Sequence, residues 1–215
     1  QEKQNLLNER NASSEIVVTG NTVIDALYQI ASRDIPLPIH VTADQKLLLV
    51  TCHRRESFGE PLTHVCKALL QIAHDNPQVL IVYPVHPNPH VTKKVYSLLN
   101  DCPSIQLLPP QPYDQFVNLM KHAYLVLTDS GGVQEEAPAL AKPVLVLRDK
   151  TERPEIIRQG LGQVIGTDPQ HVTQVTTQLL QHPEHYQAMA QGFSPYGDGQ
   201  ASQRIVEALL NFYGR

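Results

Sequence analysis

Short runs of apolar residues alternate with longer segments in which apolar residues recur at helical spacing. Several runs consist almost entirely of Leu, Ile and Val, the pattern of strands that are covered on both faces. The runs that predict strands are residues 46–52, 79–85, 105–108, 124–128, 144–147 and 162–165. The segments that predict helices are residues 61–75, 90–99, 112–122, 133–141, 153–159 and 169–181. This alternation predicts an α/β fold with a Rossmann-like, doubly wound parallel sheet, in which ligands bind at the carboxyl ends of the strands.

The two ends of the chain depart from this alternation. Residues 1–11 predict a helix, and residues 16–21 predict a strand and a turn. Residues 200–213 predict an amphipathic helix. Its apolar stripe consists of Ile205, Ala208, Leu209 and Phe212. Both terminal helices are therefore expected to pack against a neighbouring domain.

Composition and charge argue against several classes of protein. The 215 residues are 41% hydrophobic and 18% charged, as in ordinary globular proteins. A formal net charge of −4 argues against nonspecific binding to nucleic acid or to a membrane surface. No apolar run reaches the length of a spanning helix and no signal peptide is visible, so we expect a cytoplasmic protein. Three cysteines without CxxC spacing predict reduced thiols rather than a zinc site or a disulfide framework.

The most specific candidate chemistry follows the fourth predicted strand. Ser130, Gly131 and Gly132 open a predicted helix, so a capping hydroxyl and two glycines would leave its first N–H groups open to a phosphate. An ordinary capped helix start explains the same residues equally well. Glu136 lies four residues after Gly132, on the same face of the helix. This carboxylate could therefore accept hydrogen bonds from the ribose of a bound nucleotide.

Basic residues follow two other predicted strands. His53 stands beside Arg54 and Arg55, an arrangement that suits contact with a diphosphate and proton transfer near neutral pH. A solvated basic loop is the competing interpretation. Arg153 could bind phosphate, or it could cap a loop through Glu152 or Glu155. His86 and His90 have helical metal-ligand spacing, but the prolines around them exclude that helix, and we expect no metal site.

Six motifs give the chain a close resemblance to the bacterial non-hydrolysing UDP-N-acetylglucosamine 2-epimerases. They occur in order along essentially the whole chain. The motifs are VTGNTVIDAL (18–27), HRRESFG (53–59), YPVHPNP (83–89), TDSGGVQEEAP (128–138), TERPE (151–155) and PYGDG (195–199). The resemblance implies the second domain of a glycosyltransferase-B type architecture. It implies interconversion of UDP-N-acetylglucosamine and UDP-N-acetylmannosamine by elimination and re-addition of UDP, with no added cofactor.

The resemblance also implies a division into domains. Residues 1–20 would be the trailing segment of a first domain and the interdomain connection, residues 21–199 the UDP-binding domain, and residues 200–215 a helix that packs toward the first domain. The family's catalytic carboxylates belong to that first domain, so this portion alone is expected to be inactive. A homodimer is expected for the full-length enzyme.

Roles carried over from the family are assigned residue by residue. His53 resembles the active-site histidine near the diphosphate. The residues that resemble the UDP-binding set are Gln111, Phe116, Ser130, Gly131, Gly132, Glu136 and Arg153. Within that set, Gln111 and Phe116 would lie beside the uracil, and Arg54 and His86 would lie near a second, regulatory sugar-nucleotide site.

Two other functions fit the same fold. One is a UDP-binding module without catalysis, which only a first domain would distinguish from an epimerase. The other is a retaining glycosyltransferase of the same architecture. The motif that begins at His53, together with residues 151–155, favours the epimerase over the transferase.

Overall fold

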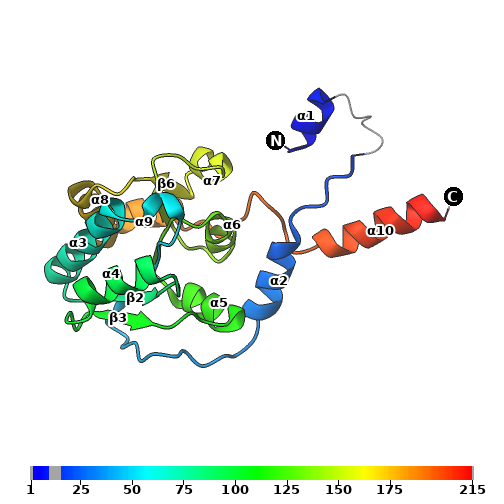
Figure 1. Ribbon diagram of the computed structural model, residues 1–215. Coiled ribbons are helices and arrows are strands. Elements are labelled where there is room, and N and C mark those ends of the chain that lie inside the picture. Colours follow the sequence, from blue (N-terminus) through cyan, green and yellow to red (C-terminus); the bar gives the residue numbers. More distant parts are fainter. Residues whose placement is uncertain (1, 10–15, 215) are drawn as a thin grey trace. The chain divides into compact units, whose positions relative to one another are not determined.

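A computed structural model describes residues 2–9 and 16–214 of the chain. Within these residues, six parallel strands form one sheet in the order β3-β2-β1-β4-β5-β6 (Figure 1). The strands are β1 (Lys46–Thr51), β2 (Val79–Pro84), β3 (Ile105–Leu108), β4 (Leu125–Thr128), β5 (Val144–Val146) and β6 (Gly162–Val164). The strand order reverses between β1 and β4. This confirms the predicted Rossmann-like, doubly wound sheet and places its topological switch point between these two strands.

Helices of the larger unit cover both faces of the sheet. The helices of the described residues are α1 (Glu2–Asn8), α2 (Thr22–Ala31), α3 (Glu60–Asp75), α4 (Pro89–Leu99), α5 (Tyr113–His122), α6 (Gly131–Ala139), α7 (Pro154–Arg158), α8 (Pro169–Gln181), α9 (Pro183–Met189) and α10 (Ala201–Tyr213), with a 3-10 turn, η2 (Arg55–Ser57), after β1. Helix α3 packs against α4 and α8, whereas α6 contacts α7. Right-handed crossovers that run outward in opposite directions from the switch point place these two groups on opposite faces.

Local sequence explains where several of these helices begin. Asn88 caps α4 by accepting a hydrogen bond from the His90 amide at 2.9 Å, and Asp168 caps α8 through the His171 amide at 2.9 Å. A proline occupies the first turn of both helices, where its missing N–H costs no helical hydrogen bond. These caps fix the helix starts close to the sequence-based boundaries.

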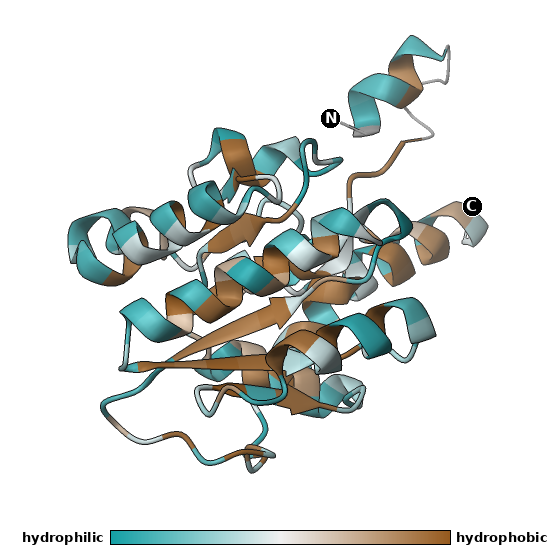
Figure 2. Cartoon of the chain, turned by 60° about the vertical axis from the view of Figure 1, so that its left-hand side comes forward, coloured by the Kyte–Doolittle hydropathy of each residue, from teal (hydrophilic) through white to brown (hydrophobic). Residues whose placement is uncertain are grey.

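The core lies on both faces of the central strands. Leu48 and Leu125 on one face of the sheet and Leu49 and Val126 on the other have no exposed surface, and the strands are the most continuously hydrophobic part of the chain (Figure 2). Burying one such side chain contributes roughly 1.5–3 kcal/mol relative to leaving it in water. The runs of Leu, Ile and Val therefore correspond to strands covered on both faces, as predicted.

The chain forms two compact units, Gln1–Gln29 with Tyr196–Arg215, and Ile30–Pro195. In the smaller unit, the Asp25 carboxylate accepts hydrogen bonds from the amides of Ala201 at 3.1 Å and Ser202 at 2.7 Å. A side chain of α2 thereby satisfies two of the open N–H groups at the start of α10, and these bonds lower the pKa of Asp25. The three-part division at residues 20 and 199 concerns a longer protein and stays a prediction.

Most predicted elements agree with the structure to within two residues, but one prediction is wrong. Residues 16–21 form no strand; Val17 and Val18 are exposed, and no neighbouring strand pairs with them among the described residues. Helices α2 and α9 were missed. The predicted helix over residues 1–11 includes residues 1, 10 and 11, which lie outside the described residues; its remainder contains α1.

Helix length and apolar character decide whether a helix can cross a bilayer. Within the described residues, no helix combines the length and the apolar character that crossing a bilayer requires.

Candidate functional site

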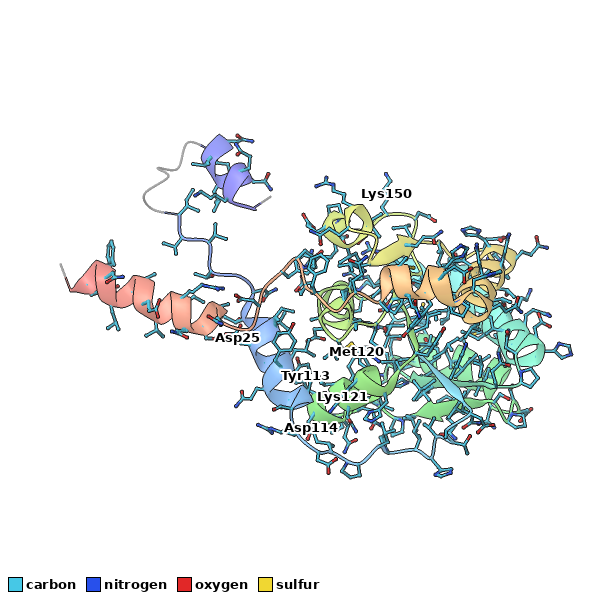
Figure 3. All side chains as sticks on the ribbon, turned by 180° about the vertical axis from the view of Figure 1, so that it is seen from behind. Asp25, Tyr113, Asp114, Met120, Lys121 and Lys150 are labelled. Carbon is cyan, nitrogen blue, oxygen red and sulfur yellow. The ribbon has the colours of Figure 1, made fainter. Side chains whose placement is uncertain are left out.

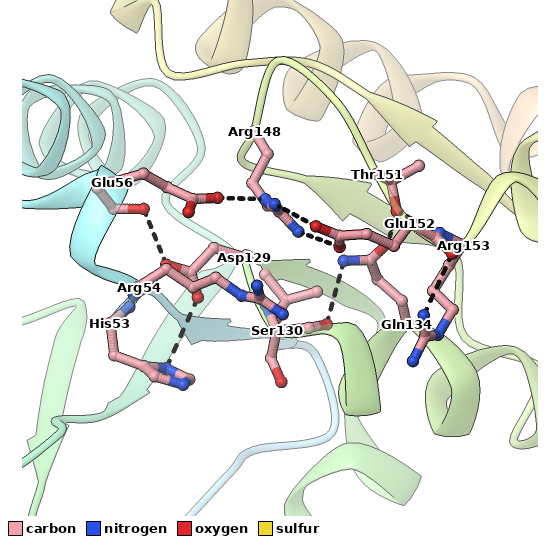
Figure 4. Close-up of polar contacts among 12 residues, drawn as sticks. His53, Arg54, Glu56, Asp129, Ser130, Gln134, Arg148, Thr151, Glu152 and Arg153 are labelled. Atoms are coloured by element: carbon pink, nitrogen blue, oxygen red, sulfur yellow. Dashed lines mark hydrogen bonds and ion pairs between the residues drawn. The ribbon is translucent and has the colours of Figure 1, made fainter.

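The loops that follow β1 and β4 meet at the switch point of the sheet, and one buried carboxylate joins them. Asp129, directly after β4, has no exposed surface. Its Oδ2 accepts hydrogen bonds from the amides of His53 and Arg54, each at 2.8 Å, and from the Ser57 hydroxyl at 2.9 Å (Figure 4). Beneath this contact, the hydroxyls of Thr51 and Thr128 lie 2.6 Å apart. Asp129 therefore fixes the backbone of the basic loop after β1.

Helix α6 begins next to this carboxylate, but its start differs from the prediction in one respect. Ser130 occupies the N-cap position, yet its side chain makes no capping hydrogen bond. Its carbonyl instead accepts from the amide of Gln134 at 3.2 Å and from the Gln134 side chain at 3.1 Å. The predicted Ser130 cap is therefore wrong. The side chain leaves the first N–H groups of α6 uncapped, as an anion site at this helix end requires.

Two guanidinium groups converge on the start of α6 from different loops. A Cβ atom on Gly131 would lie 3.4 Å from Nη2 of Arg54 and 3.9 Å from Nη2 of Arg153. Gly131 is buried, whereas Gly132 is exposed. Two fixed positive charges thus stand beside the positive end of a helix, an arrangement that favours a polyanion. We call His53, Arg54, Asp129, Gly131 and Arg153 the strand-end site.

Arg153 is held by α6. Its Nε pairs with the Glu135 carboxylate, and its Nη1 donates to the backbone carbonyl of Glu152 at 3.2 Å. The Thr151 hydroxyl accepts from the Arg153 amide at 3.0 Å and donates to the Gln134 side chain at 2.5 Å. Arg153 thus contacts Glu152, as the sequence-based alternative of a loop cap allowed, but it does so through the backbone carbonyl, and a carboxylate that pairs with it belongs to Glu135.

A third arginine ties the loops after β1 and β5 together. Arg148 lies 2.7 Å from Glu56 through Nε and makes two contacts with Glu152, at 2.6 and 2.8 Å (Figure 4). The Arg148 guanidinium lowers the pKa of Glu152 to about 2. Arg148 is paired with these two carboxylates, whereas the guanidinium groups of Arg54 and Arg153 lie beside Gly131.

His53 lies between the buried carboxylate and a second imidazole. Its Nδ1 is 3.6 Å from Oδ1 of Asp129, and its ring stacks on that of His86 with the centroids 5.0 Å apart and the planes 6° apart. Burial lowers the pKa of His53; the Asp129 charge opposes that shift, and His86 and Arg54 add to it. His53 is thus a constrained imidazole whose ordinary pKa lies near neutrality, as proton transfer requires.

The residue predicted to bind ribose already has a partner. Glu136 is 5% exposed, and one of its oxygens accepts a hydrogen bond from the Tyr113 hydroxyl at 2.7 Å. Burial raises the pKa of Glu136, and the Tyr113 hydrogen bond opposes that shift. Tyr113 is the first residue of α5 (Figure 3), and its hydroxyl joins this helix to α6 through Glu136. Gln111 precedes the same helix and donates to the Pro109 carbonyl at 2.8 Å, and Phe116 lies half-buried within α5.

The structure therefore brings together His53, Arg54, His86 and Arg153 with the start of α6, while Gln111, Phe116 and Glu136 belong to the neighbouring α5–α6 side. The site residues expected from the sequence do not include Asp129, Glu135, Tyr113 or Arg148. A signal existed for Asp129, because a residue directly after β4 in a doubly wound sheet must face the loop after β1. The other three act through contacts that no spacing indicates.

Comparison with known proteins assigns this arrangement to a family. The family model of UDP-N-acetylglucosamine 2-epimerase matches residues 1–210. The chain belongs to this family. The assignment agrees with the resemblance carried by the six motifs.

Members of the family resemble the chain in sequence and in structure. The UDP-N-acetylglucosamine 2-epimerase of Escherichia coli K12 is 50% identical over 220 residues, which cover 97% of this chain and 58% of that protein. The Neisseria meningitidis enzyme, solved bound to UDP-GlcNAc, is 42% identical with a TM-score of 0.89 over 97% of this chain and 59% of that one. The Staphylococcus aureus MnaA–UDP structure is 40% identical with a TM-score of 0.92, over 99% and 58%.

These likenesses support the fold assignment, including the glycosyltransferase-B type of the neighbours. The chain nevertheless spans less than three fifths of the length of each of these three relatives.

Proposed function

We propose that this chain is the nucleotide-binding part of a non-hydrolysing UDP-N-acetylglucosamine 2-epimerase. The observation that carries the proposal is the convergence of Arg54 and Arg153 on Gly131 at the start of α6. Two guanidinium groups and a helix N-terminus form a site for a diphosphate rather than for a neutral sugar. The Neisseria relative is described as bound to UDP-GlcNAc and the Staphylococcus relative as bound to UDP, which supports the same ligand here.

The proposed reaction explains why a diphosphate site would matter for catalysis. Epimerisation at C2 by elimination breaks the bond from the sugar to UDP, and negative charge develops on the leaving diphosphate. Removal of the weakly acidic C2 proton becomes feasible only if that charge is stabilised. Fixed cations at the start of α6 would provide this stabilisation. They would also retain UDP until it adds back to the unsaturated sugar with the opposite configuration at C2.

Individual residues take the following proposed roles. The phosphates bind at Gly131 and Gly132, between the two arginines, with Ser130 at the helix start. Glu136 accepts the ribose hydroxyls, and Gln111 and Phe116 lie beside the uracil. His53 transfers a proton near the diphosphate. Arg54, in the loop after β1, and His86, which follows β2 and stacks on His53, would contribute to a regulatory sugar-nucleotide site.

The remaining parts of the proposal concern the longer protein. The groups that act on C2 are assigned to the part of the relatives that this chain does not span. The chain alone would therefore bind UDP without epimerising the sugar nucleotide. The full-length enzyme is proposed as a cytoplasmic homodimer that needs no added cofactor.

Calorimetric titration of the chain with uridine, UMP and UDP tests the proposal. Affinity should rise with each phosphate, because the site recognises charge at the start of α6. Equal affinities for uridine and UDP would contradict it. In a second experiment the chain is incubated with UDP-N-acetylglucosamine in heavy water. Deuterium at C2 would show that the proton-transfer groups lie within these 215 residues, contrary to the proposed division of roles.

A further inference from the structure

The Asp129 carboxylate is buried at the switch point, and its two oxygens have different surroundings. Oδ2 accepts three hydrogen bonds, from two backbone amides and the Ser57 hydroxyl. Oδ1 is also buried but accepts no hydrogen bond from the residues that the structure describes. A buried acceptor without a donor costs about 1–3 kcal/mol. The first oxygen therefore has a structural role, whereas the second is left for a donor that can approach it.

His53 presents that donor. Its Nδ1 lies 3.6 Å from Oδ1 of Asp129, too far for a formed hydrogen bond but within reach of a small ring movement. The backbone amide of His53 is bonded to Oδ2 of the same carboxylate, so the residue is already anchored there. On the other side, the parallel stack with His86 restricts the tilt of the imidazole. The ring is thus confined between an acceptor and a second ring.

We propose that Asp129 is a positioning residue that holds neutral His53 with its proton on Nδ1 and leaves Nε2 free to accept a proton. A carboxylate that fixes the tautomer of an imidazole in this way determines which nitrogen does chemistry. The inference deepens the proposed function, because it states how the imidazole that is proposed to transfer a proton is oriented. Asp129 itself acts only through His53 and would not touch the ligand.

The charges that face His53 make the proposal measurable. Asp129 favours the protonated imidazole, whereas Arg54 and His86 disfavour it, and burial disfavours it most. Replacing the carboxylate by an amide of similar shape removes the one favourable charge. The pKa of His53 should then fall further, so that the ring stays neutral to a lower pH. The charge alone accounts for the shift in titration, whereas a carboxylate with a purely structural role would leave the tautomer unchanged.

The test is two-bond 1H–15N NMR of the histidine rings in the 215-residue chain, with the His53 signals assigned through His53→Asn. In the wild type we expect the Nδ1–H tautomer. In Asp129→Asn that preference should be lost, and the titration of His53 should move to lower pH. Ser57→Ala is the matched control, since it removes one hydrogen bond to Oδ2 but keeps the charge. It should retain the wild-type tautomer.

Each outcome decides the proposal. An Nε2–H tautomer in the wild type would overturn it even if Asp129→Asn failed to fold. An unchanged tautomer in folded Asp129→Asn would also overturn it, as would loss of the Nδ1–H preference in folded Ser57→Ala. Calorimetry of the same samples with UDP tests the proposed function separately, because the tautomer is read without ligand.

Discussion

The larger unit carries two recesses of opposite character. The α3–α8 groove, of about 740 Å³, lies between two helices on the surface and is lined mainly by amides. Its glutamines are Gln71, Gln170, Gln174, Gln178 and Gln181. A smaller hollow of about 320 Å³ is lined by Glu56, Ser57 and Arg148, among others, and Ser57 donates a hydrogen bond to Asp129 of the strand-end site. The larger recess has few charges, those of Lys67 and Asp75 together with the imidazole of His182, whereas Glu56 and Arg148 at the smaller one form an ion pair.

The recess with the larger volume is therefore not the one that lies among paired charges. A groove between two surface helices costs little to form, because its neutral amides remain solvated. Charges held in a partly buried network are costly unless they are paired, and such networks concentrate at functional sites. We therefore propose that the nucleotide binds at the strand-end site rather than in the α3–α8 groove. The predictions below compare substitutions in these two places.

The largest effect is expected for turnover. In the full-length enzyme, His53→Asn should reduce kcat by about 10²–10⁴-fold, the usual contribution of a general acid–base group. His182→Asn, in the α3–α8 groove, should leave kcat unchanged. Steady-state kinetics of both variants make the comparison, with unfolding by denaturant to confirm that each is folded. Near-normal turnover in His53→Asn would reduce His53 to a structural residue.

A smaller effect is expected on nucleotide affinity. Gly131→Val should weaken UDP binding by about 1–3 kcal/mol, because a side chain here displaces the Arg54 and Arg153 guanidinium groups and obstructs the phosphates. Thr177→Val replaces a hydroxyl by a methyl group in the α3–α8 groove and should not alter affinity. If calorimetry gives the same affinity for Gly131→Val and the wild type, the phosphates bind elsewhere.

Tyr113→Phe should weaken UDP binding by roughly 0.5–1.5 kcal/mol, the net worth of one hydrogen bond. Burial raises the pKa of Glu136 and Tyr113 opposes this, so loss of the hydroxyl raises the pKa further. The ribose-accepting carboxylate is lost as pH falls through its pKa. Affinity in the variant should therefore decline at a higher pH than in the wild type. Tyr96→Phe, on exposed α4, is the control, and identical pH profiles for Tyr113→Phe and the wild type would contradict this role for Tyr113.

The smallest effect is expected for stability. Glu152→Gln removes the charge of a carboxylate that pairs with Arg148 and whose side chain is more than half exposed, which should cost less than about 1 kcal/mol at pH 7. The pKa of Glu152 is lowered from 4.5 to about 2, so its stabilising contribution is present above pH 4.5 and is lost as pH falls toward 2. Urea unfolding of both proteins between pH 7 and pH 3 should show the difference shrinking with acidification. A constant difference would exclude the ion pair as its cause.

The parts of the fold that the sequence could predict are those that a local residue pattern determines. The strands β1 and β4 were located to within one residue at each end, because a strand buried on both faces must be apolar throughout. The start of α6 was also found, since two glycines after such a strand form a local pattern. Exposed Val17 and Val18 resemble a strand locally, and only the absence of a partner among the described strands shows that they form none.

The side-chain partners could not be predicted in the same way. Asp129 reaches His53 across 76 residues of sequence, and Tyr113 reaches Glu136 across 23. Arg153 pairs with Glu135, 18 residues earlier, although Glu152 and Glu155 are nearer in sequence. These contacts depend on the strand order and on the directions of side chains, and apolar periodicity contains neither.

The central claim is that charge converging on the start of α6, rather than cavity volume, marks the nucleotide site. The most direct measurement is calorimetric titration of UDP into the wild type, Arg153→Gln and Lys67→Gln, which remove one positive charge from the strand-end site and from the α3–α8 groove respectively. The account predicts that Arg153→Gln raises the Kd by at least about tenfold, as expected for a hydrogen bond to a charged group, while Lys67→Gln changes it less than about twofold. Equal effects from the two variants, or a larger effect from Lys67→Gln, would contradict the claim.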